Sequence, residues 1–292
     1  MFAAPSVRRR LRRYALATAA PRTAHGFRSE WTTVGNVHLH ARVSVGPARG
    51  KPAVVLVHGL AVSHRYLMPT AALLAPCYDV RVVDLPGFGL SGDPGRVLTI
   101  TEQADALASW LDANQIRSAI LLGNSFGCQV LVDLVTQAPH RCAGLILSGP
   151  TFDPRARTAA RQILRWLRDL LREDPLQLPF LLRDIRDAGP ARVWATFRAA
   201  LRDPIDEKLP QLTVPTLVLR GAVEPIVPAR WAREAADLIP GGDLAVVPGS
   251  PHNAVYVAAD SLVAQLRPFL HCWAASPATP LRRSAPVGRS VP

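Results

Sequence analysis

The stretch Gly123-Asn124-Ser125-Phe126-Gly127 joins a short apolar run, 120–122, to a helical pattern over 126–137. A serine on such a sharp turn between strand and helix sits in strained backbone, and small flanking residues are needed to avoid clashes. The helix that follows points the positive end of its dipole at the serine, which favours negative charge that develops there. The stretch therefore predicts a nucleophile, Ser125, at the carboxyl end of a buried strand.

Further apolar runs share the character of this strand, because each closes at a turn that contains Gly or Pro. They cover residues 54–57, 80–84, 145–147, 216–219 and 244–247. Helical patterns alternate with them, over 66–74, 101–114, 126–137, 230–238 and 254–270. This alternation predicts the α/β class, with a mostly parallel, doubly wound sheet. Residues 32–45 alternate about Gly35-Asn36 and predict an antiparallel hairpin at the sheet edge.

Residues 151–210 interrupt the strand rhythm. They place apolar residues at helical spacing among many arginines and acids, and prolines divide them into short helices. We interpret this segment as an inserted helical cap. The predicted organisation is a basic N-terminal arm (1–30), the first part of the core (31–150), the cap (151–210), the second part of the core (211–272) and a disordered tail (273–292).

The net charge of +12 is concentrated in the two ends of the chain. Residues 1–30 carry seven arginines against one glutamate, and residues 273–292 carry three arginines and no acid. The nearly balanced middle gives no reason to expect a nucleic-acid partner. Basic arms can touch anionic lipid, so a weak membrane-surface contact through the N-terminal arm is open.

The four cysteines are scattered and form no C-x-x-C pair, so neither a zinc site nor a disulfide framework is indicated. Reduced thiols suit the cytoplasm, which is the expected location. Residues 8–20 imitate the charged and apolar parts of a signal peptide, but the apolar part is short and rich in alanine.

A serine hydroxyl needs a base to take its proton. His252 follows the late apolar run 244–247, which would bring it to the same sheet edge as Ser125. Glu224 follows the run 216–219 and is the only acid in its loop, so it is the candidate that orients the imidazole. Asp153, after the run 145–147, is the reserve candidate.

Two backbone N–H groups are needed to hold a developing oxyanion. We expect them from Phe126, directly after the nucleophile, and from Leu60, after His58-Gly59. His58 itself is interpreted as a structural turn residue. The aromatic residues of the cap, Trp166, Phe180, Trp194 and Phe197, are expected either to wall a substrate pocket or to form the cap's own core.

Together these residues resemble the α/β-hydrolase fold superfamily, in its single-domain branch with a helical cap. The resemblance covers residues 30–272 and rests on motifs in the family's order. They are His58-Gly59, Asp84-Leu-Pro-Gly-Phe-Gly-Leu-Ser91, Gly123-Asn-Ser-Phe-Gly127, Gly221-Ala-Val-Glu-Pro-Ile-Val-Pro228 and His252. Glu224 stands where the family usually has Asp, and Cys128 stands where the elbow usually has a second glycine. We interpret Cys128 as a core residue.

The resemblance implies a serine hydrolase that cleaves a carboxylic ester, or a related acyl bond, of a small apolar substrate through an acyl-enzyme. It implies no metal and no organic cofactor. Two alternatives stay open: a C–C bond hydrolase of ring-fission products, whose elbow is similar, and a catalytically idle binding protein with this fold. Residues 60–64 lack the Gly-rich continuation of the C–C hydrolases. The oligomeric state is left open.

Overall fold

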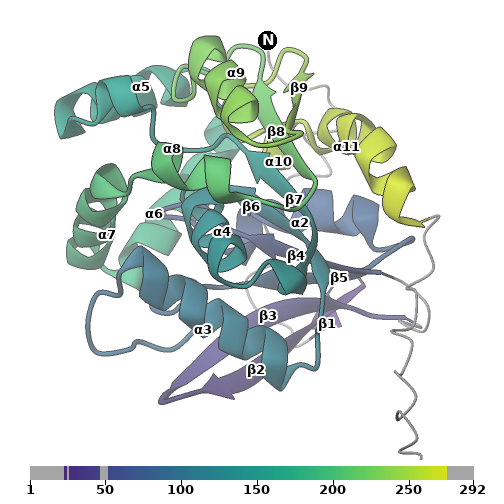
Figure 1. Cartoon of the computed structure of the whole chain (residues 1–292). Coiled ribbons are helices and arrows are strands. Elements are labelled where there is room, and N and C mark those ends of the chain that lie inside the picture. Colours follow the sequence, from purple (N-terminus) through teal and green to yellow (C-terminus); the bar gives the residue numbers. More distant parts are fainter. Residues whose placement is uncertain (1–22, 25, 47–51, 275–292) are drawn as a thin grey trace, which may run out of the picture.

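A computed structural model describes residues 23–24, 26–46 and 52–274. The described residues form a nine-stranded sheet in the order β1-β2-β3-β5-β4-β6-β7-β8-β9 (Figure 1). The strands are β1 (Thr23–Ala24), β2 (Phe27–Val34), β3 (Val37–Ser44), β4 (Ala53–Val57), β5 (Asp79–Val83), β6 (Ala119–Asn124), β7 (Cys142–Ser148), β8 (Thr216–Gly221) and β9 (Asp243–Val247). From β5 to β9 all neighbours are parallel, so the predicted α/β class is confirmed.

The antiparallel edge contains the predicted hairpin. β2 pairs with β3 up to Val34 opposite Val37, which leaves Gly35 and Asn36 as a two-residue turn. Gly35 has φ 58°, a conformation that glycine adopts without steric cost. β2 begins at Phe27, so the strand takes in the last four residues assigned to the N-terminal arm. The rest of that arm, up to residue 22, and the tail beyond 274 lie outside the described residues.

Helices cover both faces of the sheet (Figure 1). One face packs against α2 (His64–Leu74), α10 (Ala254–Val257) and α11 (Ala259–Ala274), and the other against α3 (Ile100–Ala113), α4 (Phe126–Gln137) and α9 (Ala229–Leu238). Alternate residues of one strand enter different cores: Val54 and Leu56 of β4 face α2, whereas Val55 and Val57 face α4. Both faces are therefore buried, which explains why these strands are continuous apolar runs.

The predicted single helix over 254–270 is wrong in one respect, because the chain breaks between α10 and α11. The hydroxyl of Thr70 on α2 donates to the carbonyl of Val255 at 2.6 Å. In a continuous helix that carbonyl would accept from residue 259. Ala258 instead has φ −131° and ψ 35°, which ends α10.

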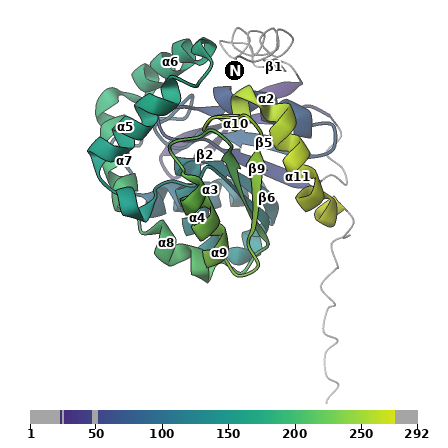
Figure 2. The ribbon, with the colours of Figure 1, turned by 90° about the horizontal axis from the view of Figure 1, so that it is seen from above.

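A helical insertion, residues 154–211, lies between β7 and β8. It contains α5 (Ala159–Leu170), α6 (Leu178–Ala188), α7 (Pro190–Arg202) and α8 (Ile205–Lys208), with short 3-10 turns η2 (Pro154–Ala156), η3 (Pro175–Gln177) and η4 (Leu209–Gln211). Pro175 and Pro190 stand at the first positions of η3 and α7, where a missing N–H costs nothing. Figure 2 shows α5, α6 and α7 together on one side of the molecule.

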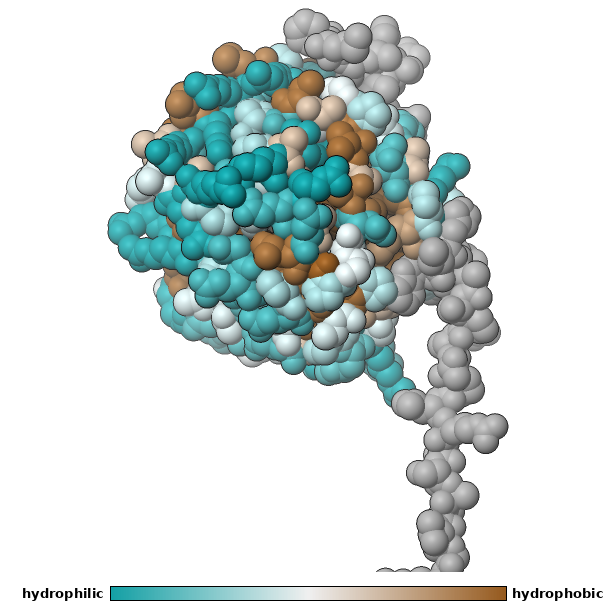
Figure 3. Space-filling model, turned by 45° about the horizontal axis from the view of Figure 1, so that its top comes forward, coloured by the Kyte–Doolittle hydropathy of each residue, from teal (hydrophilic) through white to brown (hydrophobic). Residues whose placement is uncertain are grey.

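The surface mixes polar and apolar side chains. Figure 3 shows apolar patches (brown) among hydrophilic side chains (teal) over the upper part of the molecule. Within the described ranges, no helix has both the length and the apolar character needed to cross a bilayer.

Candidate active site

Ser125 occupies the turn between β6 and α4. Its φ of 53° and ψ of −118° lie outside the regions that side-chain-bearing residues ordinarily adopt. The backbone N–H of Ser125 donates to the carbonyl of Ser148 on β7 at 2.9 Å, which fixes the turn to the neighbouring strand. The sequence motif thus folds into the strained turn that was expected.

The flanking glycines are required by close packing. A Cβ on Gly123 would lie 2.8 Å from the carbonyl carbon of Gly127, and a Cβ on Gly127 would lie 2.5 Å from the carbonyl oxygen of Val57. Real Cβ atoms do not approach so closely, so no other residue fits either position without a shift of the backbone. Cys128 is buried next to this turn and donates its thiol to the carbonyl of Gly123 at 3.3 Å. Burial raises the pKa of that thiol well above its usual range, which leaves it protonated and packed in the core.

His252 and Glu224 are hydrogen-bonded to each other at the edge of the sheet. Nδ1 of His252 donates to Oε1 of Glu224, and Oε2 of Glu224 accepts from the N–H of Gly221 at 2.9 Å. Both residues are buried, with 7% and 4% of their surface exposed. The carboxylate is therefore held by the backbone of its own turn and fixes the orientation of the imidazole ring.

Asp153, the reserve candidate, has other partners. Its carboxylate pairs with Arg165 at 2.9 Å and with Arg230 at 2.7 Å, and it accepts from the N–H of Arg155. These contacts tie η2 to α5 and α9, so the structure brings Glu224 and not Asp153 to His252.

Gly149, directly after β7, is a residue that the sequence reasoning missed. It has φ 63°, and a Cβ there would lie 2.8 Å from Cε1 of His252 and 3.3 Å from Oε1 of Glu224. The end of β7 therefore forms a wall against which the histidine and the glutamate pack. The signal was a glycine directly after a buried strand.

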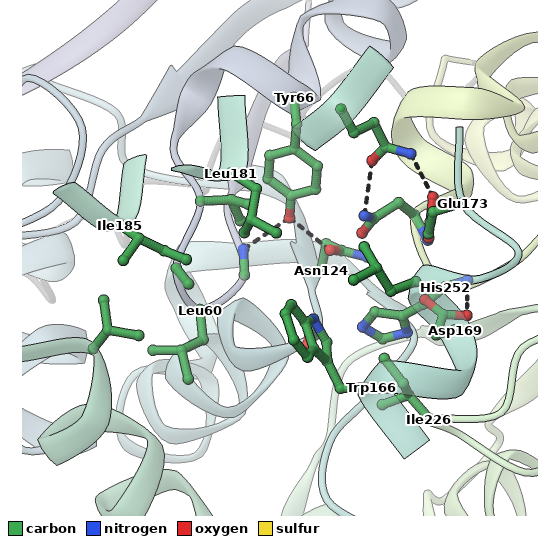
Figure 4. A pocket seen from close by; sticks show the side chains of 18 of the residues that line it. Leu60, Tyr66, Asn124, Trp166, Asp169, Glu173, Leu181, Ile185, Ile226 and His252 are labelled. Carbon is green, nitrogen blue, oxygen red and sulfur yellow. Dashed lines mark hydrogen bonds between the residues drawn. The ribbon is translucent and has the colours of Figure 1, made fainter. Parts of the chain in front are cut away.

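Two acids of the insertion were also missed. Asp169 of α5 accepts from the backbone N–H of His252 at 3.2 Å, and Glu173, just after α5, accepts from the N–H of Asn253 at 3.0 Å (Figure 4). Gln177 accepts from the side-chain amide of Asn253 at 2.9 Å. Three polar residues of the insertion thus hold the loop that carries the histidine.

The charges around His252 favour its protonated form. Burial opposes the imidazolium, but the charge and hydrogen bond of Glu224, with the charges of Asp169 and Glu173, outweigh it and raise the pKa of His252 to about 9. Burial and the neighbouring Asp169 raise the pKa of Glu173 to about 8. The site therefore holds more protons near neutral pH than isolated side chains would.

A second network fixes the loop on the other side of Ser125. The hydroxyl of Tyr66 donates to Oδ1 of Asn124 at 2.6 Å and accepts from the N–H of Gly59 at 2.8 Å. A Cβ on Gly59 would lie 3.2 Å from Cβ of Ser125, so this loop runs directly beside the serine.

The two residues expected to provide oxyanion N–H groups lie near the serine. Leu60 follows Gly59 and lines the pocket. Phe126 begins α4, where helix geometry leaves backbone N–H groups without a helical acceptor. The use of both N–H groups for an oxyanion stays a prediction.

His58 makes two contacts that fix its tautomer. Nδ1 donates to the carbonyl of Gly59 at 2.7 Å, and Nε2 accepts from the N–H of Leu85 at 3.0 Å. Burial lowers the pKa of His58, so the ring is neutral. The residue ties two loops together, as expected of a structural residue.

Among the residues that the structure describes, His40, His64 and Asp84 form a group that could hold a metal ion, with ligand atoms within 4.8 Å of one another. Nδ1 of each histidine donates to the same oxygen of Asp84, at 2.8 and 2.7 Å. Asp84 also accepts from the N–H groups of His64 and Leu90. Four N–H groups already donate to the carboxylate, so we interpret the cluster as an anchor for the loop after β5.

A pocket of about 560 Å³ opens over Ser125 and His252. Its walls are mainly apolar and include the expected aromatic residues: Trp166, Phe180, Trp194 and Phe197. Trp194 and Phe197 of α7 lie with ring centroids 5.6 Å apart. The volume lies in the range of pockets that bind small molecules.

Comparisons with known proteins identify the fold family of the chain. Residues 54–266 match the model of the alpha/beta hydrolase family. The pimeloyl-[acyl-carrier protein] methyl ester esterase of Xanthomonas oryzae pv. oryzae is 24% identical over 253 residues, which cover 75% of this chain and 95% of the esterase.

Two further proteins are similar over different extents. The biotin biosynthesis bifunctional protein BioHC of Cellvibrio japonicus is 24% identical, and the match covers 75% of this chain but only 47% of that protein. The structure of the enol-lactonase from Burkholderia xenovorans LB400 superposes with a TM-score of 0.71 at 20% identity, over 83% of this chain and all of the lactonase. The family match spans most of the sheet and all the motifs on which the resemblance rests, from His58-Gly59 to His252. The chain therefore belongs to the alpha/beta hydrolase family.

Proposed function

We propose that this hydrolase cleaves a carboxylic ester, or a related acyl bond, of a small apolar substrate, with Ser125 as nucleophile, His252 as base and Glu224 as the orienting acid. One observation carries the proposal: a strained serine and a histidine held by a buried carboxylate line the same apolar pocket. Serine hydrolases need this combination of groups.

The mechanism follows from the positions of the groups. Neutral His252 takes the proton of Ser125, whose oxygen attacks the substrate carbonyl carbon. The N–H groups of Leu60 and Phe126 stabilise the oxyanion. Protonated His252 then gives its proton to the leaving alcohol, and an acyl-enzyme remains on Ser125. Water that His252 deprotonates attacks this ester, and the carboxylic acid leaves while the serine regains its proton.

The insertion supplies the wall of the pocket over the serine, and in this role it is a cap. Its aromatic and aliphatic side chains favour an apolar acyl or alcohol group, because they offer few polar partners. The free thiols of Cys77, Cys128 and Cys142 support a reducing compartment, and we place the protein in the cytoplasm.

A fluorophosphonate probe tests the proposal, because it reacts with activated serines. We expect the wild-type protein to be labelled and the Ser125→Ala and His252→Ala variants to stay unlabelled. Ser109→Ala, at an exposed position of α3, is the matched control and should label normally. A well-folded wild-type protein that takes no label would overturn the enzyme proposal and favour a binding protein with this fold.

A further inference from the structure

The helical insertion presents an apolar surface to solvent. It comprises Leu164, Leu167 and Leu171 of α5 and its end, Leu178 and Leu182 of α6, and Trp194 of α7, all more than a third exposed. We call it the insertion surface. Leu171 is 88% exposed and Leu182 is 59% exposed, values that are unusual for leucine in a monomer that contacts only water.

The sequence of α5 divides its circumference into three sectors. At 100° per residue, Leu164, Leu167 and Leu171 share one side. Asp169 and Glu173 point the opposite way and are buried against the loop of His252. Leucines that a core would normally bury therefore face outward on this helix.

The third sector is basic. Arg161, Arg168 and Arg172 are exposed beside the leucines, and within the described part of the chain none of them forms an ion pair. Arg161 and Arg172 donate only to backbone carbonyls. Since both acids of this segment are turned inward, the outer surface of α5 offers only apolar groups and positive charge.

The insertion surface continues into the pocket. Trp166, Leu170, Leu178 and Trp194 line the pocket and are themselves more than a third exposed. The pocket is thus lined by exposed apolar side chains of α5, α6 and α7, and these helices lie together on one side of the molecule (Figure 2).

We propose that the insertion surface docks to an anionic lipid bilayer, with α5 lying in the interface. Amphipathic helices that bind membranes in this way combine arginines on the polar side with Leu and Trp on the other. Phosphate groups of the lipids would meet Arg161, Arg168 and Arg172, while the leucines enter the acyl region. The pocket would then receive apolar esters directly from the bilayer. This last step rests on the proposed function, whereas the docking does not.

Sedimentation with lipid vesicles tests the docking on the full-length Ser125→Ala protein, so that catalysis plays no part. We expect binding to vesicles of phosphatidylcholine with phosphatidylglycerol and much weaker binding to phosphatidylcholine alone. Leu167→Asp with Leu171→Asp should weaken binding at least about tenfold, because two apolar side chains no longer leave water. Neither leucine lines the pocket, so hydrolysis of a water-soluble ester by the corresponding active protein should be unchanged.

Two controls make the outcome specific. Val246→Asp, on the edge strand β9, places one negative charge at an exposed apolar residue elsewhere and should leave binding intact. Substitution of glutamine for the arginines at 8, 9, 10, 12 and 13 tests the N-terminal arm. Binding that depends on the arm and not on the leucines would overturn the proposal. So would a leucine-dependent dimer in lipid-free solution without vesicle binding, because the surface would then be an interface between two copies.

Discussion

Ser125 lies at the carboxyl end of the parallel strands, and the helical insertion lies above it. The two regions are stabilised by different kinds of contact. At the sheet edge, glycines allow contacts that leave no room for a Cβ, as at Gly123, Gly127 and Gly149. In the insertion, Gly189 has nothing within 4 Å of the Cβ position, and several leucines face water. The comparison indicates that the residues proposed for catalysis lie beside positions that tolerate no added side-chain atom. The surface that controls substrate access, in contrast, tolerates substitutions.

The largest effect is expected at the serine and its base. Ser125→Ala or His252→Ala should each lower kcat by about 10⁴-fold or more, since each removes a group that acts with the others as a unit. Steady-state hydrolysis of a p-nitrophenyl ester measures this. The double variant should be little slower than either single variant, and additive losses would show that the two residues do not act together.

Gly149 and Gly189 sharpen the comparison between the two regions. Gly149→Ala should lower kcat by about 10²-fold, because the methyl group meets His252 at 2.8 Å and displaces it from Glu224. Gly189→Ala has a similar strain, with φ 82°, but no steric contact. It should cost about 1–3 kcal/mol of unfolding free energy and leave kcat unchanged. Steady-state kinetics and denaturant unfolding of both variants measure these effects. Equal losses of kcat in the two variants would show that the two glycines do not differ in their importance for catalysis.

The pH dependence of kcat/KM tests the contact between the insertion and the loop that carries His252. With the pKa of His252 at about 9, the neutral base becomes available as the pH rises, so kcat/KM of the wild-type protein should increase up to about pH 9. Asp169→Asn with Glu173→Gln removes the charge of Asp169 and the charge that Glu173 carries above its pKa of about 8, both of which favour the imidazolium. The pKa of His252 should therefore fall, and the acid limb of the profile should move to lower pH.

A structural role alone would lower kcat at every pH without moving this limb. Arg186→Gln, at an exposed position of α6, is the matched control and should leave the profile in place. An unchanged limb in the double variant would show that the insertion does not tune the base.

The features at the carboxyl ends of the strands could be predicted from the sequence, whereas the contacts of the insertion could not. The six parallel strands, the turn of Ser125 and the position of His252 follow from local patterns, because each lies within or directly after an apolar run. The contact of His252 with Glu224 was expected for the same reason, since two neighbouring strands bring their ends to one edge. Its role in catalysis stays a prediction.

Contacts over long distances in the sequence were not predictable. Asp169 lies 83 residues from His252, and the helical period of α5 shows which way its acid points but not what packs there. The break at Ala258 depends on Thr70, 185 residues from the carbonyl that it binds. Asp153 carried the same local signal as Glu224, and only the arginines around it distinguish the two.

The most direct test of the account is the isolation of its covalent intermediate. Wild-type protein mixed with a p-nitrophenyl ester and quenched in acid within milliseconds should gain the mass of the acyl group, and peptide mapping should place that group on Ser125. An acyl group on another residue, or steady turnover with no adduct at any quench time, would contradict the claim that Ser125 is the nucleophile.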